Sequence, residues 1–254
     1  MSMDLGSELD EQVALVTGAS SGIGSATAAS LASRGARVVL ASRREDELEE
    51  LEARIEDDGG EALVVETDVT NDDDIDNVVE TTLDEYGRID ILVNNAGLMP
   101  LAHIAEGDRE TLQTTIDVNL SGLIKLTHAV VPTMIDQESG YIVNVSSVVG
   151  RFLQPNSSHY NATKAGVKTF GDSLRLDVAE EGIHVATIEP GSVDTELLDH
   201  IPDDELQSDV REPVGSMESL APEDIARTIT FVVTQPPRVD INEVLVRPID
   251  QVQP

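Results

Sequence analysis

The sequence predicts an α/β fold, a single doubly wound domain in which strands and helices alternate along the whole chain. The chain has 254 residues, of which 40% are hydrophobic, so it can bury one sizeable core. Short apolar runs alternate with amphipathic helical stretches, and neither a linker nor an internal repeat interrupts them. We therefore expect residues 1–254 to form one domain.

Seven short apolar segments are the predicted strands, because each is rich in β-branched or aliphatic residues and is bounded by polar residues. They are residues 13–17, 37–42, 62–66, 89–94, 140–146, 184–189 and 243–247. Helices are predicted between them, most clearly at 72–86, where apolar residues recur every three or four positions behind the candidate caps Asn71 and Asp72.

A glycine-rich turn, Gly18-Ala-Ser-Ser-Gly22-Ile-Gly24, follows the first predicted strand and precedes an alanine-rich helical stretch that ends at Arg34. Glycine permits positive φ and close approach of backbone N–H groups to a phosphate, and the helix N-terminus adds a positive dipole. The strand, turn and helix together favour a dinucleotide site over an ordinary tight turn. The expected cofactor contacts here are Gly18, Ser20, Ser21, Gly22, Ile23 and Gly24.

The second predicted strand ends at Ser42-Arg43-Arg44, where such folds contact the adenosine ribose. A carboxylate there would accept the ribose hydroxyls of NAD, whereas two guanidiniums favour a 2′-phosphate. One charge-assisted hydrogen bond contributes about 1.5–3 kcal/mol, roughly a 10- to 150-fold preference. The sequence therefore predicts NADP(H), chiefly through Arg43. The alternative is that the arginines only oppose the acidic residues 45–50.

Tyr160 stands four residues before Lys164 in a predicted helix, 160–181, and Ser147 lies thirteen residues before Tyr160. Residues four apart share a helix face, so we expect the ammonium to lie near the phenol and to lower its pKa from about 10. The chain has only three tyrosines and three lysines, so chance gives such a pair about 0.04 times. The trio predicts a redox enzyme acting on a carbonyl or alcohol, and a surface pair is the alternative.

Composition excludes several other functions. Acidic residues outnumber basic ones 49 to 16 and give a net charge of −33, so nucleic acid and anionic membranes are poor partners. The absence of cysteine removes disulfides and thiolate chemistry. The five histidines have no metal-motif spacing, and no metal is predicted. No apolar run approaches about 18 residues and no basic region precedes a hydrophobic start, so we expect a soluble, cytoplasmic protein.

Five motifs appear in order: Thr17-Gly18-x-x-x-Gly22-x-Gly24, Asn94-Asn95-Ala96-Gly97, Ser147, Tyr160-x-x-x-Lys164 and Pro190-Gly191. With these motifs the chain resembles the short-chain dehydrogenase/reductase family over residues 12–247. The resemblance implies a Rossmann domain with a seven-stranded parallel sheet and three helices on each face, assembled as a homotetramer or homodimer. The seven predicted strands agree with that architecture.

The resemblance also implies roles for individual residues. Tyr160 would be the catalytic acid and base, Ser147 would bond the substrate oxygen, Lys164 would hold the nicotinamide ribose, and Asn119, in a predicted helix at 117–136, would position a water. Implied cofactor contacts are Asp68, Val69, Asn95, Ala96, Gly97, Tyr160, Lys164, Pro190, Gly191, Val193 and Thr195. The alternatives are turn chemistry at Asp68 and strand-ending turns at 94–97 and 190–191.

The substrate is expected to be small and neutral or apolar. In the family a variable segment after Pro190-Gly191 closes the pocket, here residues 194–219. The expected pocket residues are Ser147, Phe152, Leu153, Tyr160, Leu197 and Leu198, and Leu98, Met99 and Gln154 are further wall candidates or core residues. Arg151 and Arg211 are the nearest cations for a substrate carboxylate.

These observations predict an NADP-dependent alcohol dehydrogenase or carbonyl reductase. The end of the last strand, Asn242-Glu-Val-Leu-Val-Arg247-Pro, lacks the Val-Asp-Gly-Gly turn of many relatives and resembles NADP-dependent carbonyl and hydroxy-acid reductases. The alternatives are a 3-oxoacyl reductase, an NADP-sensing binding protein without turnover, and an epimerase or dehydratase that regenerates its nicotinamide.

The net charge of −33 predicts that salt stabilises the protein. Like charges repel one another and destabilise the compact state, and a Debye length of about 3 Å near 1 M salt removes most of that repulsion. We expect adaptation to a salt-rich cytoplasm, as in a halophilic microbe, and a melting temperature that rises from low to multimolar KCl. A melting temperature that stays constant over this range would contradict the hypothesis.

Overall fold

The structure is a computed structural model that describes residues 9–197 and 218–252. Seven strands form one sheet in the order β3-β2-β1-β4-β5-β6-β7, and every neighbouring pair is parallel. The strands are β1 (Val13–Thr17), β2 (Arg37–Ser42), β3 (Glu61–Glu66), β4 (Ile91–Asn94), β5 (Gly140–Val145), β6 (Ile183–Pro190) and β7 (Glu243–Val246). The predicted seven-stranded parallel sheet is confirmed, with strand ends within two residues of the predicted positions.

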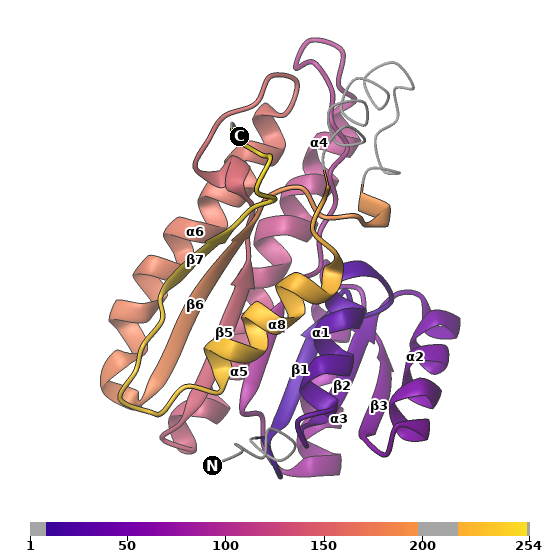
Figure 1. Ribbon diagram of the computed structural model, residues 1–254, viewed down its shortest axis with the longest axis vertical. Helices are drawn as coiled ribbons and strands as arrows, with labels where there is room; N and C mark the ends of the chain where they lie inside the picture. The colour runs from indigo at the N-terminus through magenta and orange to yellow at the C-terminus, as the bar shows by residue number, and fades with distance from the viewer. Residues whose placement is uncertain (1–8, 198–217, 253–254) are drawn as a thin grey trace.

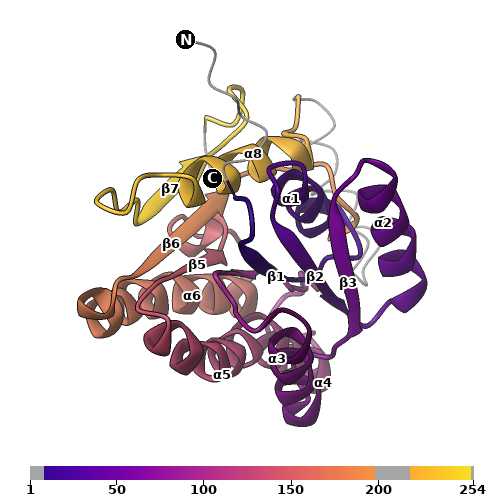
Figure 2. The same cartoon turned by 90° about the horizontal axis from the view of Figure 1, so that it is seen from below.

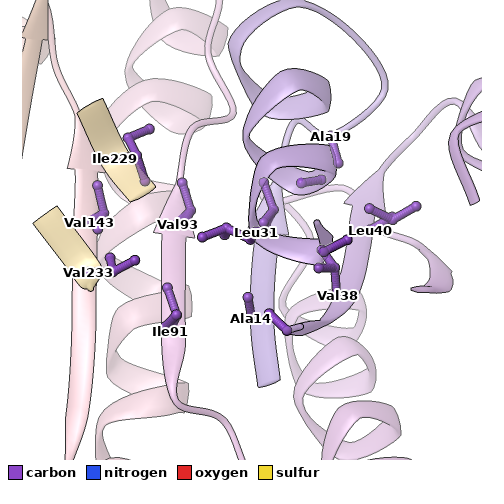
Figure 3. Packing of buried hydrophobic residues seen from close by; sticks show 14 of the residues in the cluster. Ala14, Ala19, Leu31, Val38, Leu40, Ile91, Val93, Val143, Ile229 and Val233 are labelled. Atoms are coloured by element: carbon purple, nitrogen blue, oxygen red, sulfur yellow. The ribbon is translucent and has the colours of Figure 1, made fainter. Parts of the chain in front are cut away.

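Helices cover both faces of the sheet (Figures 1 and 2). One face carries α1 (Gly22–Ala32), α2 (Glu45–Asp57) and α8 (Pro222–Val233), and the other carries α3 (Asp72–Tyr86), α5 (Leu123–Asp136) and α6 (Ser158–Val178). Figure 3 shows the hydrophobic core on the face covered by α1, α2 and α8. There, Leu31 of α1 and Ile229 of α8 pack on Val93 and Val143 of the central strands. Because both faces are covered, every residue of β1, β4 and β5 is buried.

The strand order reverses between β1 and β4. From β1 the chain winds outward through β2 to β3, and it then returns to place β4 on the other side of β1, with Leu15 opposite Leu92. The connections therefore leave in opposite directions at the carboxyl ends of β1 and β4, and a crevice opens there. In open α/β sheets this crevice is where ligands bind.

Helix α3 forms where the sequence places it. The Asn71 side chain accepts a hydrogen bond of 3.0 Å from the Asp73 amide and caps the first turn. The helix ends at Gly87, whose φ of 72° is in the left-handed region that glycine favours. Both ends are thus set by local chemistry.

The helix predicted at 117–136 begins earlier. It starts as α4 (Arg109–Ile116), capped by Asp108, and passes through a π-helical turn, η1 (Asp117–Gly122), before α5. The sequence pattern missed α4 because its residues are mostly polar and Thr115 is its one fully buried side chain. A π-helical turn inserts an extra residue into the hydrogen-bonded helix and frequently marks a functional site. The turn η1 contains Asn119.

Two other helix ends differ from the predictions. Helix α6 begins at Ser158, two residues before the predicted start, and its last predicted residues form the 3₁₀ turn η3 (Ala179–Glu181). Helix α1 ends at Ala32 instead of Arg34. Helix ends fray and tighten into 3₁₀ turns, so shifts of this size are expected.

One helical run in the described part of the chain, Arg109–Asp136, is long and apolar enough to cross a membrane by length and composition alone. Its residues Leu126, Val130 and Met134 are completely buried in the core between the helices and the sheet. Packing in the core therefore accounts for its apolar character.

Candidate functional site

A cavity of about 1060 Å³ opens at the carboxyl ends of β1, β2, β4, β5 and β6. It extends from the glycine-rich turn at the end of β1 to the catalytic trio predicted around β5 and α6. Most of the predicted cofactor residues line it: Gly18, Ser20, Ser21, Gly22, Ile23, Ser42, Arg43, Arg44, Asp68, Val69, Asn95, Ala96, Gly97, Tyr160, Lys164, Pro190, Gly191, Val193 and Thr195.

The glycine-rich turn exposes backbone to this cavity because no side chain fits there. Gly18 and Gly22 have φ values of 64° and 52°, in the left-handed region. A β carbon on Gly18 would lie 2.9 Å from Cα of Ala96, and one on Gly24 would overlap the Gly18 carbonyl oxygen. Gly24 does not line the cavity, and its lack of a side chain allows α1 to pack closely on the turn.

Asn95 fastens the end of β4 to the glycine-rich turn. Its side-chain amide donates to the carbonyl oxygens of Thr17 and Gly18 at 3.0 and 3.2 Å, and its backbone N–H donates to the Thr17 hydroxyl at 3.0 Å. These bonds hold the two sides of the strand-order reversal together. Asp68, just after β3, accepts hydrogen bonds from both the backbone N–H and the hydroxyl of Thr70. Its side chain therefore stabilises a turn, and the residue also lines the cavity.

The three predicted catalytic side chains around β5 and α6 come together. Ser147 follows β5 and caps the short 3₁₀ turn η2 (Val148–Gly150), while Tyr160 and Lys164 occupy successive turns of α6. The Ser147 hydroxyl lies close enough to Tyr160 to lower the pKa of the phenol. Lys164 Nζ lies 5.8 Å from the centre of the Tyr160 ring and donates to the Val145 carbonyl oxygen at 3.0 Å. Ser147, Tyr160 and Lys164 all line the cavity.

The protonation of this trio differs from the expected one. Burial raises the pKa of Tyr160 to about 12, and the neighbouring Ser147 hydroxyl opposes the rise. Burial also lowers the pKa of Lys164 to about 8. The prediction that Lys164 lowers the pKa of Tyr160 is wrong for the protein without cofactor, because loss of hydration dominates at both groups and disfavours both charged forms.

Asn119 braces the chain below the cavity instead of lining it. Its side-chain oxygen accepts from the Leu98 amide at 2.7 Å, its amide donates to the Leu98 carbonyl oxygen at 2.8 Å, and a longer contact of 3.3 Å reaches Thr163 on α6. The side chain is fully buried within η1. The structure thus places Asn119 where it positions the segment after β4 against the helix that carries Tyr160.

Two arginines stand at the end of β2 and differ in their partners. Arg44 donates to the hydroxyls of Ser20 and Ser21 at 3.0 and 2.7 Å and to the Glu196 carboxylate at 3.1 Å. Arg43 lines the cavity without a hydrogen bond or ion pair to any residue in the described ranges. One of the two arginines also faces an acidic residue of α2, as the alternative interpretation of the sequence expected: Arg44 Nη1 lies 3.8 Å from the Glu47 carboxylate.

The predicted substrate wall is partly wrong. Phe152 and Leu153 do not line the cavity: Phe152 packs beneath the Arg247 guanidinium, and Leu153 points into solvent with 78% of its surface exposed. Neither position could be told from local sequence, because the chain leaves the cavity only after Val148 and Val149 of η2 and returns to it at Gln154. Ser147, Tyr160 and Leu197 line the cavity as predicted, and so do the further candidates Leu98, Met99 and Gln154.

Some predictions about the wall fall outside the described residues, namely Leu198, Arg211 and most of the segment 194–219. Arg151, the other cation considered for a substrate carboxylate, is already engaged. It donates to Glu189 at 2.7 Å and also pairs with Glu243. It is therefore committed to the ends of β6 and β7.

The chain after β7 also contributes to the cavity, and no motif in the sequence predicted this contribution. Asp250, Gln251 and Val252 line the cavity, and Gln251 Oε1 accepts from the Ser192 amide at 2.9 Å. A β carbon on Gly191 would overlap that oxygen and would lie 3.2 Å from Cα of Arg247, so a side chain there would displace Gln251. No local signal could have revealed this contact, because it joins segments 59 residues apart. Other lining residues missed are Ala41, Thr67, Leu101, Val118, Val145, Ser146, Val148, Val149, Pro155, Asn156, Ser192 and Glu196.

No group of three or more potential metal ligands gathers anywhere in residues 9–197 and 218–252. The side chains around the cavity offer proton transfer and hydrogen bonding, beside a backbone surface suited to phosphate groups.

Comparison with known proteins agrees with this geometry. Residues 12–206 match the family model of the short chain dehydrogenases. An uncharacterized oxidoreductase of Staphylococcus saprophyticus is 42% identical over 95% of this chain and 99% of its own length. A second uncharacterized oxidoreductase, from Listeria monocytogenes, is 37% identical over 96% of this chain and 98% of its own.

Solved structures are similar throughout. A metagenomic short-chain oxidoreductase in complex with NADP has a TM-score of 0.82 and 34% identity, covering 95% of this chain and 99% of that one. The closed form of a serine dehydrogenase complexed with NADP+ has a TM-score of 0.87 and 32% identity over 94% of this chain and 96% of that one. The chain is an oxidoreductase that belongs to the short-chain dehydrogenase family.

Proposed function

We propose that the protein is an NADP-dependent alcohol dehydrogenase or carbonyl reductase that interconverts a small neutral or apolar carbonyl compound and its alcohol. The observation that carries this proposal is that Ser147, Tyr160 and Lys164 line the same cavity as the glycine-rich turn, with the Lys164 ammonium 5.8 Å from the centre of the Tyr160 ring. The structural relatives with NADP in their descriptions support the choice of cofactor.

The residues present fit a dinucleotide phosphate. The cavity of about 1060 Å³ exceeds the volume that a drug-sized ligand needs. Gly18 and Gly22 offer backbone without side chains at the start of α1, where a helix dipole favours the pyrophosphate. Arg43 and Arg44 would hold a 2′-phosphate, and Lys164 would hold the nicotinamide ribose. The cofactor would supply the hydride.

Ser147 and Tyr160 would bind the carbonyl oxygen together. With a pKa of about 12, the Tyr160 phenol is fully protonated at neutral pH and is ready to donate. An alkoxide is much more basic than a phenolate, so proton transfer to the developing alkoxide runs downhill even from a weak phenol. The Lys164 ammonium near the ring then stabilises the phenolate. Alcohol oxidation uses the same groups in reverse.

The walls of the cavity favour a neutral substrate. Leu98, Met99, Leu101 and Leu197 supply apolar surface near the trio. Arg151 is engaged with buried Glu189, and Asp250 adds a negative charge to the lining. Lys164 is the cation that lines this end of the cavity in the described ranges, and the proposal assigns it to the nicotinamide ribose. A substrate carboxylate would therefore lack a cation of its own, and an unpaired charge is costly to desolvate.

Assembly and environment belong to the same proposal. Large apolar side chains are exposed on helices of both faces, Leu176 on α6 and Phe231 on α8, at 71% and 58% exposure. These surfaces support a homodimer or homotetramer. The net charge of −33 supports a salt-rich cytoplasm.

Removing the Tyr160 hydroxyl tests the proposed chemistry. We expect Tyr160→Phe to keep NADPH affinity and to lose about 10²- to 10⁴-fold in kcat, the usual contribution of a positioned acid. Turnover is followed through nicotinamide absorbance with a panel of ketones and alcohols in multimolar KCl. Tyr86→Phe, at the end of α3 and outside the cavity, is the matched control. Equal turnover in both variants would remove Tyr160 from its role, and no turnover in the unchanged protein would favour a binding protein.

The lowered pKa of Lys164 predicts a pH-dependent stability in the cofactor-free protein. Between the folded pKa of about 8 and the reference value of 10.5, the unfolded chain binds a proton that the folded chain lacks. The free energy of unfolding therefore increases with pH in this window, by about 2 kcal/mol between about pH 7.5 and 9.5. Denaturant unfolding at fixed KCl should show this gain, and Lys164→Met should abolish it.

The control for this measurement is Lys125→Met, because Lys125 pairs with Asp72 on the surface. It should keep the full gain in stability. The measurement stays below about pH 10 because the buried tyrosines, whose pKa values are raised to about 12, reverse the trend above that point. If the free energy of unfolding of Lys164→Met increased with pH as much as that of the unchanged protein, Lys164 would not be the group responsible for the pH dependence.

A matched pair of substrates tests the preference for neutral compounds. Ethyl acetoacetate and acetoacetate share the reacting ketone and differ in charge. We expect kcat/KM to be at least about tenfold higher for the ester, because the acid must desolvate an unpaired carboxylate. Asp250→Asn should raise kcat/KM for acetoacetate by about two- to fivefold and leave kcat/KM for the ester unchanged. Glu223→Gln, on the exposed start of α8, should change neither value. A preference for the acid in the unchanged protein would refute the substrate class.

A further inference from the structure

Arg44 joins two segments of the cavity wall that are far apart in the sequence. It lies at the start of α2 and reaches the glycine-rich turn through its contacts with Ser20 and Ser21. Its third contact, Glu196, belongs to the segment after β6. Ser20, Ser21 and Glu196 all line the cavity. The guanidinium thus links the cofactor side of the cavity to the side that leads toward the substrate segment.

The three nitrogens of this guanidinium each have a different partner. Nε donates to Ser20, Nη2 donates to Ser21, and Nη1 donates to the Glu196 carboxylate at 3.1 Å. A guanidinium binds carboxylate and phosphate oxygens with the same forked geometry. The Glu196 carboxylate therefore occupies an Arg44 donor that a phosphate oxygen would use.

We propose that Glu196 weakens the preference of this protein for a 2′-phosphate by competing with that phosphate for Arg44. The inference rests on the proposed NADP function. Glu196 acts here as a positioning residue, because it would act on the cofactor through Arg44. When a 2′-phosphate arrives, it must displace the carboxylate from Nη1 or accept a second anion beside the same guanidinium. Either route costs affinity that a ligand without the phosphate keeps.

The expected change in affinity follows from the solvent exposure of the Arg44 and Glu196 side chains. The side chains of Arg44 and Glu196 are 43% and 60% exposed, and pairs with such exposure are weak. We therefore expect a change of about two- to fivefold in affinity, which is the range of exposed ion pairs. Salt screens the pair, so the change should shrink as KCl increases.

The experiment compares two ligands that differ only in the 2′-phosphate, adenosine 2′,5′-bisphosphate and adenosine 5′-monophosphate. Calorimetric titration gives both dissociation constants at the lowest KCl at which the protein stays folded, so turnover is not needed. Glu196→Gln should bind the bisphosphate about two- to fivefold more tightly and leave the monophosphate unchanged. A general structural effect would change both affinities, and their ratio separates the two explanations.

Two further variants make the test specific. Glu47→Gln removes a carboxylate that lies 3.8 Å from the same Nη1 atom, and it should change the ratio less than Glu196→Gln does. In an Arg44→Ala background, Glu196→Gln should have no effect on the ratio, because the coupling runs through Arg44. An equal effect of the two glutamate variants, or an effect that persists without Arg44, would overturn the inference in favour of general charge removal.

The outcomes also separate this inference from the proposed function. If the unchanged protein binds both ligands equally, the preference for NADP fails and the inference fails with it. If the unchanged protein prefers the bisphosphate and Glu196→Gln leaves the ratio as it was, the NADP proposal stands and the competition is refuted.

Discussion

The close approach of three backbone segments at Gly18 is the constraint on which the rest of the site depends. Helix α1, the glycine-rich turn and the end of β4 meet there, and added β carbons at Gly18 or Gly24 would collide with neighbouring backbone. Asn95 spans the junction with hydrogen bonds to Thr17 and Gly18. This junction sets the distance between the glycine-rich turn and the segment that Asn119 braces, and hence the position of the turn relative to Tyr160 and Lys164.

Burial, more than charge, sets the properties of the trio before any cofactor binds. A lysine and a tyrosine four residues apart on an exposed helix would favour each other's charged forms. Here both side chains are buried, and desolvation moves both pKa values toward the neutral forms. A cofactor with ribose hydroxyls near Lys164 would return acceptors to the ammonium, so the cation beside Tyr160 would become stronger when the site is filled.

The sequence predicted those features that depend on neighbours in the chain. The strands followed from apolar runs, α3 from its period and its Asn71 cap, and the glycine-rich turn from its spacing. Features that depend on contacts between distant segments were not predicted. They include the hydrogen bond between Gln251 and Ser192, the ion pair between Arg151 and Glu189, and the exposure of the Leu153 side chain to solvent. Helix α4 was missed for another reason, since its polar residues carry almost no periodic apolar signal.

The acidic surface and an anionic cofactor impose opposite demands that salt can reconcile. A net charge of −33 repels a phosphorylated ligand at long range in dilute buffer. At about 1 M salt the Debye length is about 3 Å, so the distant acids no longer act while groups in direct contact still do. The decisive charges are then those within reach of the ligand, Arg43, Arg44 and Glu196. In the proposed NADP-dependent enzyme, cofactor choice would depend on a few contacts at the end of β2, and we expect the Glu196 carboxylate on Arg44 to modulate it.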